Sequence, residues 1–370
     1  MARLFTVGPV QMHPRTMAVK SQSVPYFRTA DFSTVMAEID KMLKALLKTA
    51  PTSKCAYLTA SGTGAMEAAI INLFTSKDKL LIINGGTFGK RFALICEVCG
   101  IPFEELIVNE GYALSRRHFM EFDNKGFTGL LVNLDESSTG QLYDAFLIKD
   151  FCHRNHLILV IDAMTTFLCD PFDMDHFSAD AVIISSQKGL ALSPGLSTVI
   201  VNEKTVENRV NHIAPKSLYF NLKDYFSDIA RGQTPYTPAI GVLLEMHDML
   251  RNISCKGVEN HIAEISRRAR YFREKAKVLC VDIPTYPLSN CLTPISFQVP
   301  IAKRVFDELK KDYGYTVNPS GGIKAEYQLR ISHIGDLDLS DYDSLISAIQ
   351  HIMNQWARDQ VGGAPFEESP

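Results

Sequence analysis

Lys188 and Asp162 are the two charged residues whose positions first indicate chemistry. Asp162 ends the apolar run LILVID, and Lys188 follows the apolar run AVIIS and two further polar residues later in the chain. Ligands of open α/β sheets bind at the carboxyl ends of the strands. A carboxylate there is poorly solvated and requires a cationic partner, and a lysine among apolar residues is rarely buried without a function. The structural alternative for Asp162 is that it caps the following turn.

A small-residue turn supplies a third feature. Ser61-Gly62-Thr63-Gly64 stands between an apolar strand and a helix. Free N–H groups and the positive end of the helix dipole meet at such a turn, and the glycines allow the backbone to approach a ligand, which predicts a cradle for an anion. The same four residues also make a good helix N-cap, so both interpretations stay open. Neither a Walker motif nor G-x-G-x-x-G is present, which argues against nucleoside triphosphates and dinucleotides.

Pyridoxal 5′-phosphate (PLP) uses all three features together. It requires a lysine amine that bonds to its aldehyde, a carboxylate that keeps its pyridine nitrogen protonated, and a helix N-terminus with hydroxyls for its phosphate. The residue types therefore predict PLP chemistry, with Lys188 and Asp162 at its centre.

The elements that must position these residues read as an α/β fold. Short apolar runs rich in Val, Ile and Leu alternate with amphipathic stretches, as in a parallel sheet covered by helices on both faces. We expect one large, mostly parallel sheet of seven strands at Cys55–Thr59, Lys79–Asn84, Glu105–Val108, Gly129–Asn133, Leu157–Asp162, Ala181–Ser185 and Thr198–Asn202. The helices expected between them include Ala65–Phe74, Gly89–Cys99 and Ala145–Asn155.

The C-terminal third has a different pattern. A long helical stretch from Ile240 to Lys277 is interrupted by NISCKG, and the runs PISFQVP and YQLRIS then indicate strands between helices. This predicts a smaller α+β domain. The expected divisions are an N-terminal segment over the active site at 1–20, a large PLP-binding domain at 21–250, a small C-terminal domain at 251–360 and a disordered tail at 361–370.

Charge and cysteine usage restrict the class of protein. The 370 residues carry 38 Lys+Arg and 41 Asp+Glu, so the formal charge of -3 gives no general reason to bind nucleic acid or an anionic membrane. Eight cysteines are spread along the chain, which predicts reduced thiols in a cytoplasmic protein. Cys96 and Cys99 lack a second pair at zinc spacing, so no metal site is expected. The N-terminus matches neither a signal peptide nor a membrane span.

Several motifs together resemble the class V aminotransferase family of fold-type I PLP enzymes. They are FTVGPV (5–10), ASGTGAMEA (60–68), NGGTFGKR (84–91), ESSTG (136–140), IDAMTTF (161–167), SSQKGLALSPG (185–195), TPYTP (234–238) and LRISHIGDL (329–337). The family includes alanine–glyoxylate, serine–pyruvate and 2-aminoethylphosphonate–pyruvate transaminases. The resemblance covers nearly the whole chain and implies the large and small domains of that fold.

The resemblance also implies a role for individual residues. Lys188 takes the place of the catalytic lysine and Asp162 that of the pyridinium partner. The remaining cofactor positions are Phe88 stacked on the ring, Ser61, Gly62 and Thr63 around the phosphate, Gln187 at the phosphate or ring, and Ser138 or Thr139 near the pyridoxal hydroxyl. Thr237 matches a phosphate ligand from the partner subunit, which implies a homodimer with shared active sites. Arg330 matches the arginine that binds the substrate carboxylate.

The mouth of the pocket is implied to lie under the N-terminal segment that contains Gly8 and Val10. Many relatives have a His-Arg pair where this chain has Phe27 and Arg28. Arg28 either approaches the substrate or pairs with an acid such as Asp31 or Glu38. Structural alternatives also exist for other positions: Phe88 as a core aromatic residue, Arg330 as a surface charge, and Thr237 as the residue before a helix that begins at Pro238.

The predicted reaction is a ping-pong amino transfer from a small donor such as alanine or serine to glyoxylate or pyruvate. A 2-aminoethylphosphonate–pyruvate transaminase is the close alternative, because the HIGDL segment and the start of the chain resemble those enzymes. A cysteine desulfurase-like lyase would need a mobile nucleophile, for which Cys291 is the candidate, although its place before an apolar strand favours packing. A scaffold without catalysis is disfavoured because Lys188, Asp162 and the cradle are all present.

Overall fold

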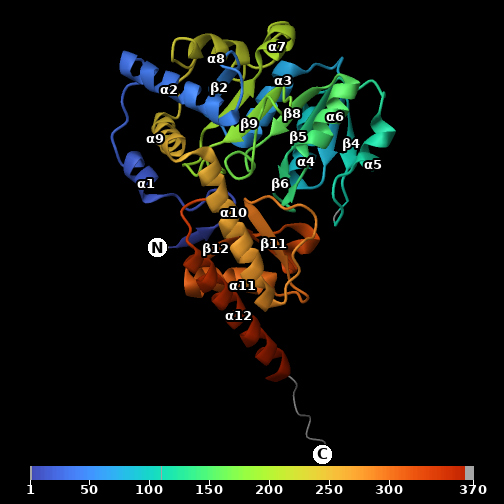
Figure 1. Cartoon of the computed structure of the whole chain (residues 1–370), viewed down its shortest axis with the longest axis vertical. Coiled ribbons are helices and arrows are strands. Elements are labelled where there is room, and N and C mark those ends of the chain that lie inside the picture. The colour runs from blue at the N-terminus through green and yellow to red at the C-terminus, as the bar shows by residue number, and fades with distance from the viewer. Residues whose placement is uncertain (1, 110, 363–370) are drawn as a thin grey trace, which may run out of the picture.

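A seven-stranded sheet and a four-stranded sheet organise the protein in the computed structural model, which describes residues 2–109 and 111–362. Figure 1 shows the larger sheet and its helices in the upper part of the molecule and the smaller sheet with the last helices below it. The predicted division into a large α/β part and a smaller α+β part corresponds to these two sheets.

The large sheet is mostly parallel, as predicted. Its strands, in their order across the sheet, are β2 (Lys54–Leu58), β10 (Ser197–Val201), β9 (Ala181–Ser185), β8 (Ile158–Asp162), β5 (Gly129–Asn133), β3 (Leu80–Asn84) and β4 (Phe103–Ile107). Only β10 runs antiparallel to its neighbours among these strands. All seven predicted strands are confirmed, with ends shifted by one or two residues at most.

Helices cover both faces of this sheet, and each face has its own buried apolar cluster. One face carries α2 (Ala30–Leu47), α5 (Arg116–Phe119), α6 (Ala145–Asn155) and α9 (Ile240–Lys256). The other carries α3 (Gly62–Leu73), α4 (Thr87–Val98), α7 (Glu203–Thr205) with the π-helical turn η2 (Val206–Val210), and α8 (Leu222–Ile229). Because both faces are covered, the strands are apolar on both sides, which is the pattern that identified them.

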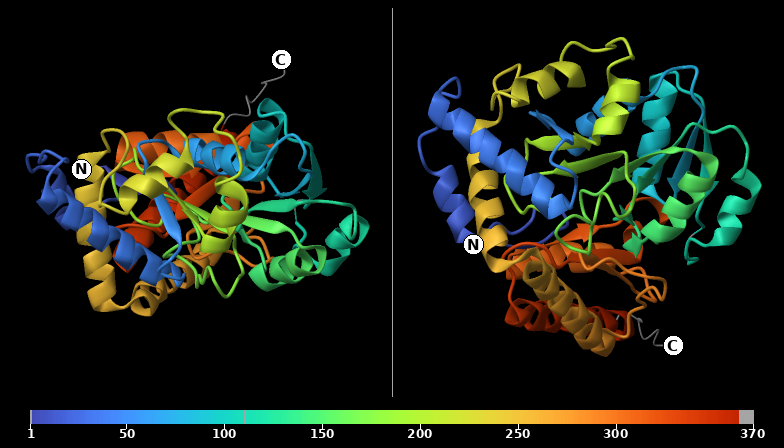
Figure 2. Two further views of the ribbon diagram at one scale, coloured as in Figure 1. Left: turned by 90° about the horizontal axis from the view of Figure 1, so that it is seen from above. Right: turned by 45° about the horizontal axis from the view of Figure 1, so that its top comes forward.

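The small sheet includes a strand from the N-terminus of the chain. Its strands lie in the order β1 (Arg3–Phe5), β12 (Tyr315–Pro319), β13 (Gln328–Ser332) and β11 (Leu292–Ser296), and β1 runs parallel to β12. The sheet packs with α10 (Val258–Lys275), α11 (Ala302–Glu308) and α12 (Leu339–Gly362) around one apolar cluster. The right-hand view of Figure 2 shows these orange and red elements gathered beside the green strands of the large sheet.

Gly257 separates two long helices close to residue 250, where the sequence predicts that the large domain ends. The predicted interruption NISCKG is helical as far as Lys256, and only Gly257, with φ of 88°, separates α9 from α10. That left-handed conformation is accessible to glycine at little cost, so the helix turns there. α9 packs against α2, whereas α10 packs against α12.

The shorter elements complete the chain. They are α1 (Pro14–Lys20), β6 (Asp135–Glu136), β7 (Gln141–Leu142), η1 (Met120–Phe122), η3 (Ala276–Leu279), η4 (Leu309–Tyr313) and η5 (Gly322–Glu326). Of the predicted tail 361–370, residues 363–370 lie outside the described residues, and the backbone of α12 extends through Gly362. Within the described residues, no helix combines the length and apolar character needed to cross a membrane.

Candidate active site

Asp162 and Lys188 lie at the carboxyl edge of the large sheet. Asp162 is the last residue of β8, and it is aligned with Ile183 of the neighbouring parallel strand β9. β9 ends at Ser185, so the turn that follows places Lys188 just beyond the same edge. The parallel pairing of β8 and β9 therefore brings together two residues that are distant in the sequence.

Asp162 is a buried carboxylate with two hydrogen bonds. Its Oδ2 accepts from Asn133 Nδ2 at 2.5 Å, and its Oδ1 accepts from the backbone N–H of Met164 at 2.9 Å. Burial raises the pKa of Asp162 to about 6, although these two donors and the Lys188 ammonium act to lower it. The bond from Met164 is the turn cap proposed as the structural alternative, but Oδ2 accepts from the Asn133 amide, which is not part of that turn.

Lys188 presents an amine that is poised to react. Burial lowers the pKa of Lys188, while the nearby Asp162 carboxylate acts to raise it. Its Nζ lies 5.7 Å from the centroid of the Phe88 ring and makes no hydrogen bond or ion pair with another described residue. Such an amine is partly neutral at a lower pH than an exposed lysine, which makes it available as a nucleophile or base.

Gly8 packs directly on Lys188. A Cβ added at Gly8 would lie 2.7 Å from Lys188 Cδ, so no larger residue fits without movement. The strand β1, three residues earlier, holds this segment in the small sheet. Val10 does not share this position, because it is 2% exposed and packs in an apolar cluster with Cys291 and Ile334. Val10 is thus part of the core of this chain, and its contact with substrate stays a prediction.

Glu136 organises the ESSTG segment and the start of α4. Its buried carboxylate accepts from the backbone N–H groups of Phe88 at 3.1 Å and Gly89 at 3.0 Å. It also accepts from the Ser138 N–H at 3.1 Å and from the Ser138 hydroxyl at 2.6 Å. One acid therefore satisfies the free N–H groups of a helix and fixes the loop beside it.

Ser138 and Thr139 differ in what their hydroxyls contact. Ser138 Oγ lies between Glu136 and the backbone N–H of Thr87, which donates to it at 3.1 Å. Gly86 is needed opposite, since a Cβ there would lie 2.2 Å from Ser138 Oγ. Thr139 is buried, and its hydroxyl donates to the carbonyl of Glu136 at 3.2 Å. Ser138 is therefore the hydroxyl that is better placed to meet a ligand.

A cavity of about 680 Å³ opens between the two parts of the protein. Its lining comes from Gly85–Phe88, Ser138, Thr139, Ser320–Lys324 and Arg330. Arg330, on β13, donates from Nη1 to the carbonyl of Ser137 at 2.9 Å and from Nη2 to that of Pro319 at 2.8 Å. Its Nε is buried with no hydrogen-bond partner among the described residues, and burial lowers the pKa of the guanidinium. Arg330 is thus not a surface charge, and its Nε is a donor that the described residues leave unused.

The small-residue turn begins α3, as expected for a cradle. Ser61 is the N-cap residue, but its side chain makes no capping bond. A Cβ at Gly62 would lie 2.3 Å from Met164 Sδ, so this glycine allows close approach to the loop after Asp162. The hydroxyl of Thr63 accepts from Arg91 Nη1 at 2.9 Å.

A chain of hydroxyls connects the cradle to the turn that carries Lys188. Gln187 Oε1 accepts from Ser185 Oγ at 2.7 Å, and Ser185 Oγ lies 2.9 Å from Ser197 Oγ. Ser197 Oγ donates in turn to the carbonyl of Ala60, the residue before the cradle, at 3.1 Å. The strands β9 and β10 therefore fix the relative positions of Gln187 and the cradle.

Arg28 does not join the cavity in this chain. It is exposed and donates to Gln233 Oε1 at 3.3 Å and to the carbonyl of Pro235 at 3.2 Å. Among the described residues it forms an ion pair with neither Asp31 nor Glu38, so the structural alternative for Arg28 does not hold, and its approach to the substrate stays a prediction.

Thr237 is also exposed and outside this chain's own cavity. It lies in a loop where Thr234 Oγ1 donates to the carbonyl of Tyr236 at 2.7 Å. α9 begins at Ile240, with Pro238 still in the loop, so the predicted helix start at Pro238 is wrong.

Cys291 is a packed thiol. It is fully buried, and its Sγ donates to Asp135 Oδ2 at 2.7 Å. Burial raises the pKa of Cys291 well above its usual value, which keeps it protonated, and raises that of Asp135 to about 7. A mobile loop nucleophile, as a desulfurase requires, has the opposite properties.

Sequence reasoning missed three residues that build the site. Asn133, Glu136 and Arg91 contact Asp162, Ser138 and Thr63 respectively. Each lies at or beside a strand end or in a quoted motif, and a polar residue in such a place was the available signal. The sequence does not indicate which distant residue each of these side chains contacts.

Comparison with known proteins agrees with this architecture. The family model described as "Aminotransferase class-V" matches residues 16–280, which is more than half of the chain. The chain therefore belongs to the class V aminotransferase family, a family of PLP-dependent enzymes.

Individual relatives and structures cover almost the whole chain. A soluble hydrogenase 42 kDa subunit from Anabaena cylindrica is 26% identical over 95% of this chain and 92% of the relative. A 2-aminoethylphosphonate–pyruvate transaminase from Pseudomonas fluorescens is 27% identical over 95% of this chain and 96% of its own length. The crystal structure of an alanine–glyoxylate aminotransferase from Nostoc sp. is 22% identical, with a TM-score of 0.88, and covers 95% of this chain and 96% of its own, which shows the shared fold.

Proposed function

We propose that the protein transfers an amino group from a small donor such as alanine or serine to glyoxylate or pyruvate, with PLP as its cofactor. One observation carries this proposal. The Lys188 amine has a lowered pKa and no partner within the described residues, and it lies at the sheet edge that also holds the buried Asp162 carboxylate. An amine in that state beside a buried acid has no structural purpose that we can identify.

The residues of the site fit PLP. Lys188 supplies an amine for its aldehyde, Asp162 a carboxylate for its ring nitrogen, and Phe88 an aromatic face for its ring. When bound, PLP supplies the electron sink that allows a proton to leave the α-carbon of an amino substrate. A positive ring nitrogen beside Asp162 would lower the pKa of that carboxyl and keep it ionised.

Lys188 is then the group that holds and moves the proton. Its lowered pKa favours the neutral amine, which can accept a proton from one carbon and return it to another. Gly8 leaves room for this movement, because any side chain there would press on the lysine.

Arg330 is the proposed ligand of the substrate carboxylate. Its guanidinium is half-buried at the cavity, and its Nε is unused within the described residues. A planar fork of donors matches a carboxylate. Ser138 is the proposed neighbour of the pyridoxal hydroxyl, because its Oγ, unlike that of Thr139, lies between a carboxylate and an N–H.

A 2-aminoethylphosphonate–pyruvate transaminase is the second candidate. Lys324 lines the same cavity as Arg330, so two cations lie where a phosphonate would bind. A relative with that activity matches the chain at 27% identity. Arg330 would serve the phosphonate of the donor and the carboxylate of pyruvate in turn.

A single-turnover screen tests the proposal. The purified protein, loaded with PLP, is mixed with alanine, serine or 2-aminoethylphosphonate, and the visible absorbance of the bound cofactor is followed. We expect rapid loss of the band with the true donor and its return on adding glyoxylate or pyruvate. If none of the amines changes the band, or if cysteine instead releases sulfide, the proposed reaction is wrong.

We also propose a homodimer in which Thr237 reaches the partner's cradle. Thr237 is exposed beside a surface with the exposed apolar side chains Val24, Tyr26 and Leu218. Covering such side chains stabilises an interface. The contact of Arg28 with Pro235 would then shape a shared loop, not the chain's own pocket.

Complementation tests the shared site. Chains with Lys188→Ala and chains with Thr237→Glu are each expected to be inactive, since glutamate would repel a phosphate. After mixing by reversible unfolding, one site of each mixed dimer contains neither change, so activity should return. A monomer by analytical ultracentrifugation, or a mixture that stays inactive, would contradict the shared site.

We retain the cytoplasm as the proposed location. All eight cysteines are free thiols, and most of them are buried, as suits a reducing compartment. Cell fractionation with an antibody against the protein tests this directly.

A further inference from the structure

Arg91 crosses from α4 to the first turn of α3. Its Nη1 donates to Thr63 Oγ1 at 2.9 Å, and its guanidinium carbon lies 5.4 Å from the centroid of the Phe88 ring. The side chain is half-buried. A cation is therefore held between the cradle residue Thr63 and the aromatic ring that faces Lys188.

This cation has no acidic partner in the part of the chain that the structure describes. Arg209, which also contacts the α3 side of the sheet, is paired with Asp78 at 2.7 Å, whereas Arg91 makes no ion pair within the described residues. The N-terminus of α3 carries partial positive charge of its own and receives no side-chain cap. Two positive features at one place are unfavourable unless an anion joins them.

The other cradle residues have no charge to offer. The residues proposed to hold the phosphate supply hydroxyls, an amide and backbone N–H groups, and they are Ser61, Gly62, Thr63, Gln187 and Thr237. A phosphate monoester carries about -1.5 to -2 charges at pH 7. Hydrogen bonds to neutral donors satisfy its oxygens, but a charged donor makes a bond roughly twice as strong as a neutral one.

We propose that Arg91 binds the phosphate group of PLP and supplies the positive charge that the cradle otherwise lacks. The inference rests on the proposed PLP chemistry of this site. Thr63 accepts one N–H of the fork and so orients it, which leaves the other donors of the guanidinium for phosphate oxygens. The stacking of Arg91 near Phe88 links the phosphate end of the site to its ring end.

Paired ligands test this role separately from activity. Dissociation constants of PLP and of pyridoxal, which lacks the phosphate, are measured by absorbance and fluorescence titration of the cofactor-free protein. For Arg91→Gln we expect PLP binding to weaken by about 10- to 100-fold, as befits a lost charged hydrogen bond. Pyridoxal binding should stay within about threefold of the unmodified protein, because no phosphate is involved.

Lys90→Gln is the matched control. Lys90 precedes Arg91 in α4 and is exposed. Its substitution removes the same charge as Arg91→Gln, but at a side chain that has no hydrogen bond to Thr63. We expect this variant to bind PLP as the unmodified protein does. Arg91→Lys keeps the charge but loses the fork, and we expect it to recover part of the lost PLP affinity.

Two results would overturn the inference. Equal weakening of PLP and pyridoxal by Arg91→Gln would mean that Arg91 only positions Phe88 and Thr63. Unchanged PLP affinity would mean that it does not meet the phosphate. Failure of the unmodified protein to bind PLP at all would instead contradict the proposed function, so the two failures are distinguishable.

Discussion

Two hollows lie at opposite edges of the large sheet, and they differ in whether their charged side chains already have hydrogen-bond partners. The cavity at the carboxyl edge has a volume of about 680 Å³ and is lined by Ser138, Phe88 and Arg330 among others. A pocket of about 400 Å³ lies at the amino edge, where β8 and β9 begin. Both contain charged groups, so charge alone does not tell them apart.

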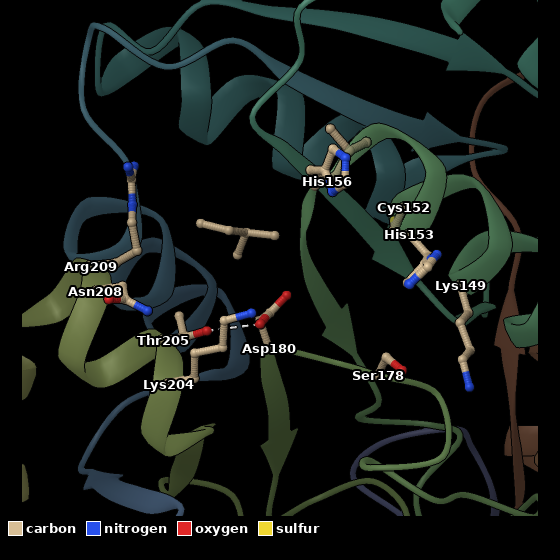
Figure 3. A pocket seen from close by; sticks show the side chains of 12 residues that line it. Lys149, Cys152, His153, His156, Ser178, Asp180, Lys204, Thr205, Asn208 and Arg209 are labelled. Atoms are coloured by element: carbon tan, nitrogen blue, oxygen red, sulfur yellow. Dashed lines mark hydrogen bonds between the residues drawn. The ribbon is translucent and has the colours of Figure 1, made fainter. Parts of the chain in front are cut away.

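The charged groups of the amino-edge pocket are already engaged or exposed. Asp180 accepts from the backbone N–H of Leu159, from Asn202 and from Thr205, and Figure 3 shows the last of these bonds as a dashed line. Arg209 is bound to Asp78, and Lys149 donates to the carbonyl of His176. The other labelled polar residues of Figure 3, such as Lys204 and His156, are exposed to solvent, and the labelled Cys152 is a buried thiol.

The carboxyl-edge site is the reverse case. Lys188 and Arg330 are half-buried, and burial lowers the pKa of both. The Nε of Arg330 is itself buried with no hydrogen-bond partner, and Lys188 makes no hydrogen bond or ion pair, among the described residues. Buried polar groups without partners reduce stability and persist only where something else requires them. A pocket alone therefore does not identify the active site. The better indication is a charged side chain, shielded from solvent, whose hydrogen-bond donors have no partner.

The largest expected effect comes from Lys188→Ala. Without the amine there is no bond to the cofactor aldehyde and no group to move the proton, so we expect kcat to fall by about 10³-fold or more. The visible absorbance of the lysine-bound cofactor should also disappear. The measurement is steady-state kinetics with an absorbance spectrum. Activity close to that of the unmodified protein would show that another residue acts as the base.

Asp162→Asn is expected to lower kcat by about 10²-fold, because a neutral amide holds a charged ring nitrogen less well. In contrast, the same substitution should increase the free energy of unfolding of the cofactor-free protein. The pKa of Asp162 is raised from 3.8 to about 6, so this group reduces stability as the pH rises from about 4 to about 6, and the loss is complete above that value.

The variant lacks this penalty. Its free energy of unfolding should therefore exceed that of the unmodified protein by on the order of 1–3 kcal/mol at pH 7.5, and by little at pH 3.5. Urea unfolding of both cofactor-free proteins at the two pH values measures the difference. A gain in stability that is equal at both pH values would show that folding does not raise the pKa of Asp162.

Arg330→Lys keeps a charge but loses the planar fork. We expect KM for the keto acid to rise by about 10- to 100-fold, with a smaller change in kcat, because the carboxylate that Arg330 is proposed to bind does not react. Initial rates over a range of pyruvate or glyoxylate concentrations measure this. A fall in kcat with KM unchanged would place Arg330 outside the substrate contact.

Lys204→Ala, in the amino-edge pocket, has the smallest expected effect. Lys204 is exposed and makes no ion pair within the described residues, so kcat, KM and PLP affinity should each stay within about twofold. The same assays measure it beside Lys188→Ala. A loss of activity comparable to that of Lys188→Ala would remove the distinction between the two hollows.

Local patterns in the sequence predicted most of the fold and the two residues at the centre of the site. Apolar runs marked the seven strands, because a sheet buried on both faces leaves an unbroken apolar signature. The positions of Asp162 and Lys188 followed from them, since a polar residue after a buried strand must lie at a sheet edge. The short helix α1 and the amphipathic helix α2 were not among the predicted helices. Of the predicted interruption NISCKG, only Gly257 breaks the helix, because NISCK is helical despite its composition.

Other contacts have no local signature. Glu136 was noticed as part of a motif, but nothing near it in the sequence names Phe88 and Gly89 as its donors. The resemblance places Val10 near the mouth of the pocket, but nothing in the sequence indicates that it also packs in an apolar cluster with Cys291 and Ile334.

The amino-acid sequence by itself determined the seven-stranded architecture, the apolar strands that end in Asp162 and near Lys188, and the turn that begins α3. Only the tertiary structure decided that β1 joins β12, with Arg3 aligned with Tyr315, and so brings Gly8 onto Lys188. The same holds for Arg91 against Thr63. The physical reason is that strand and helix formation depend on residues close in the chain, whereas these contacts join distant segments whose pairing is selected by the packing of the whole molecule.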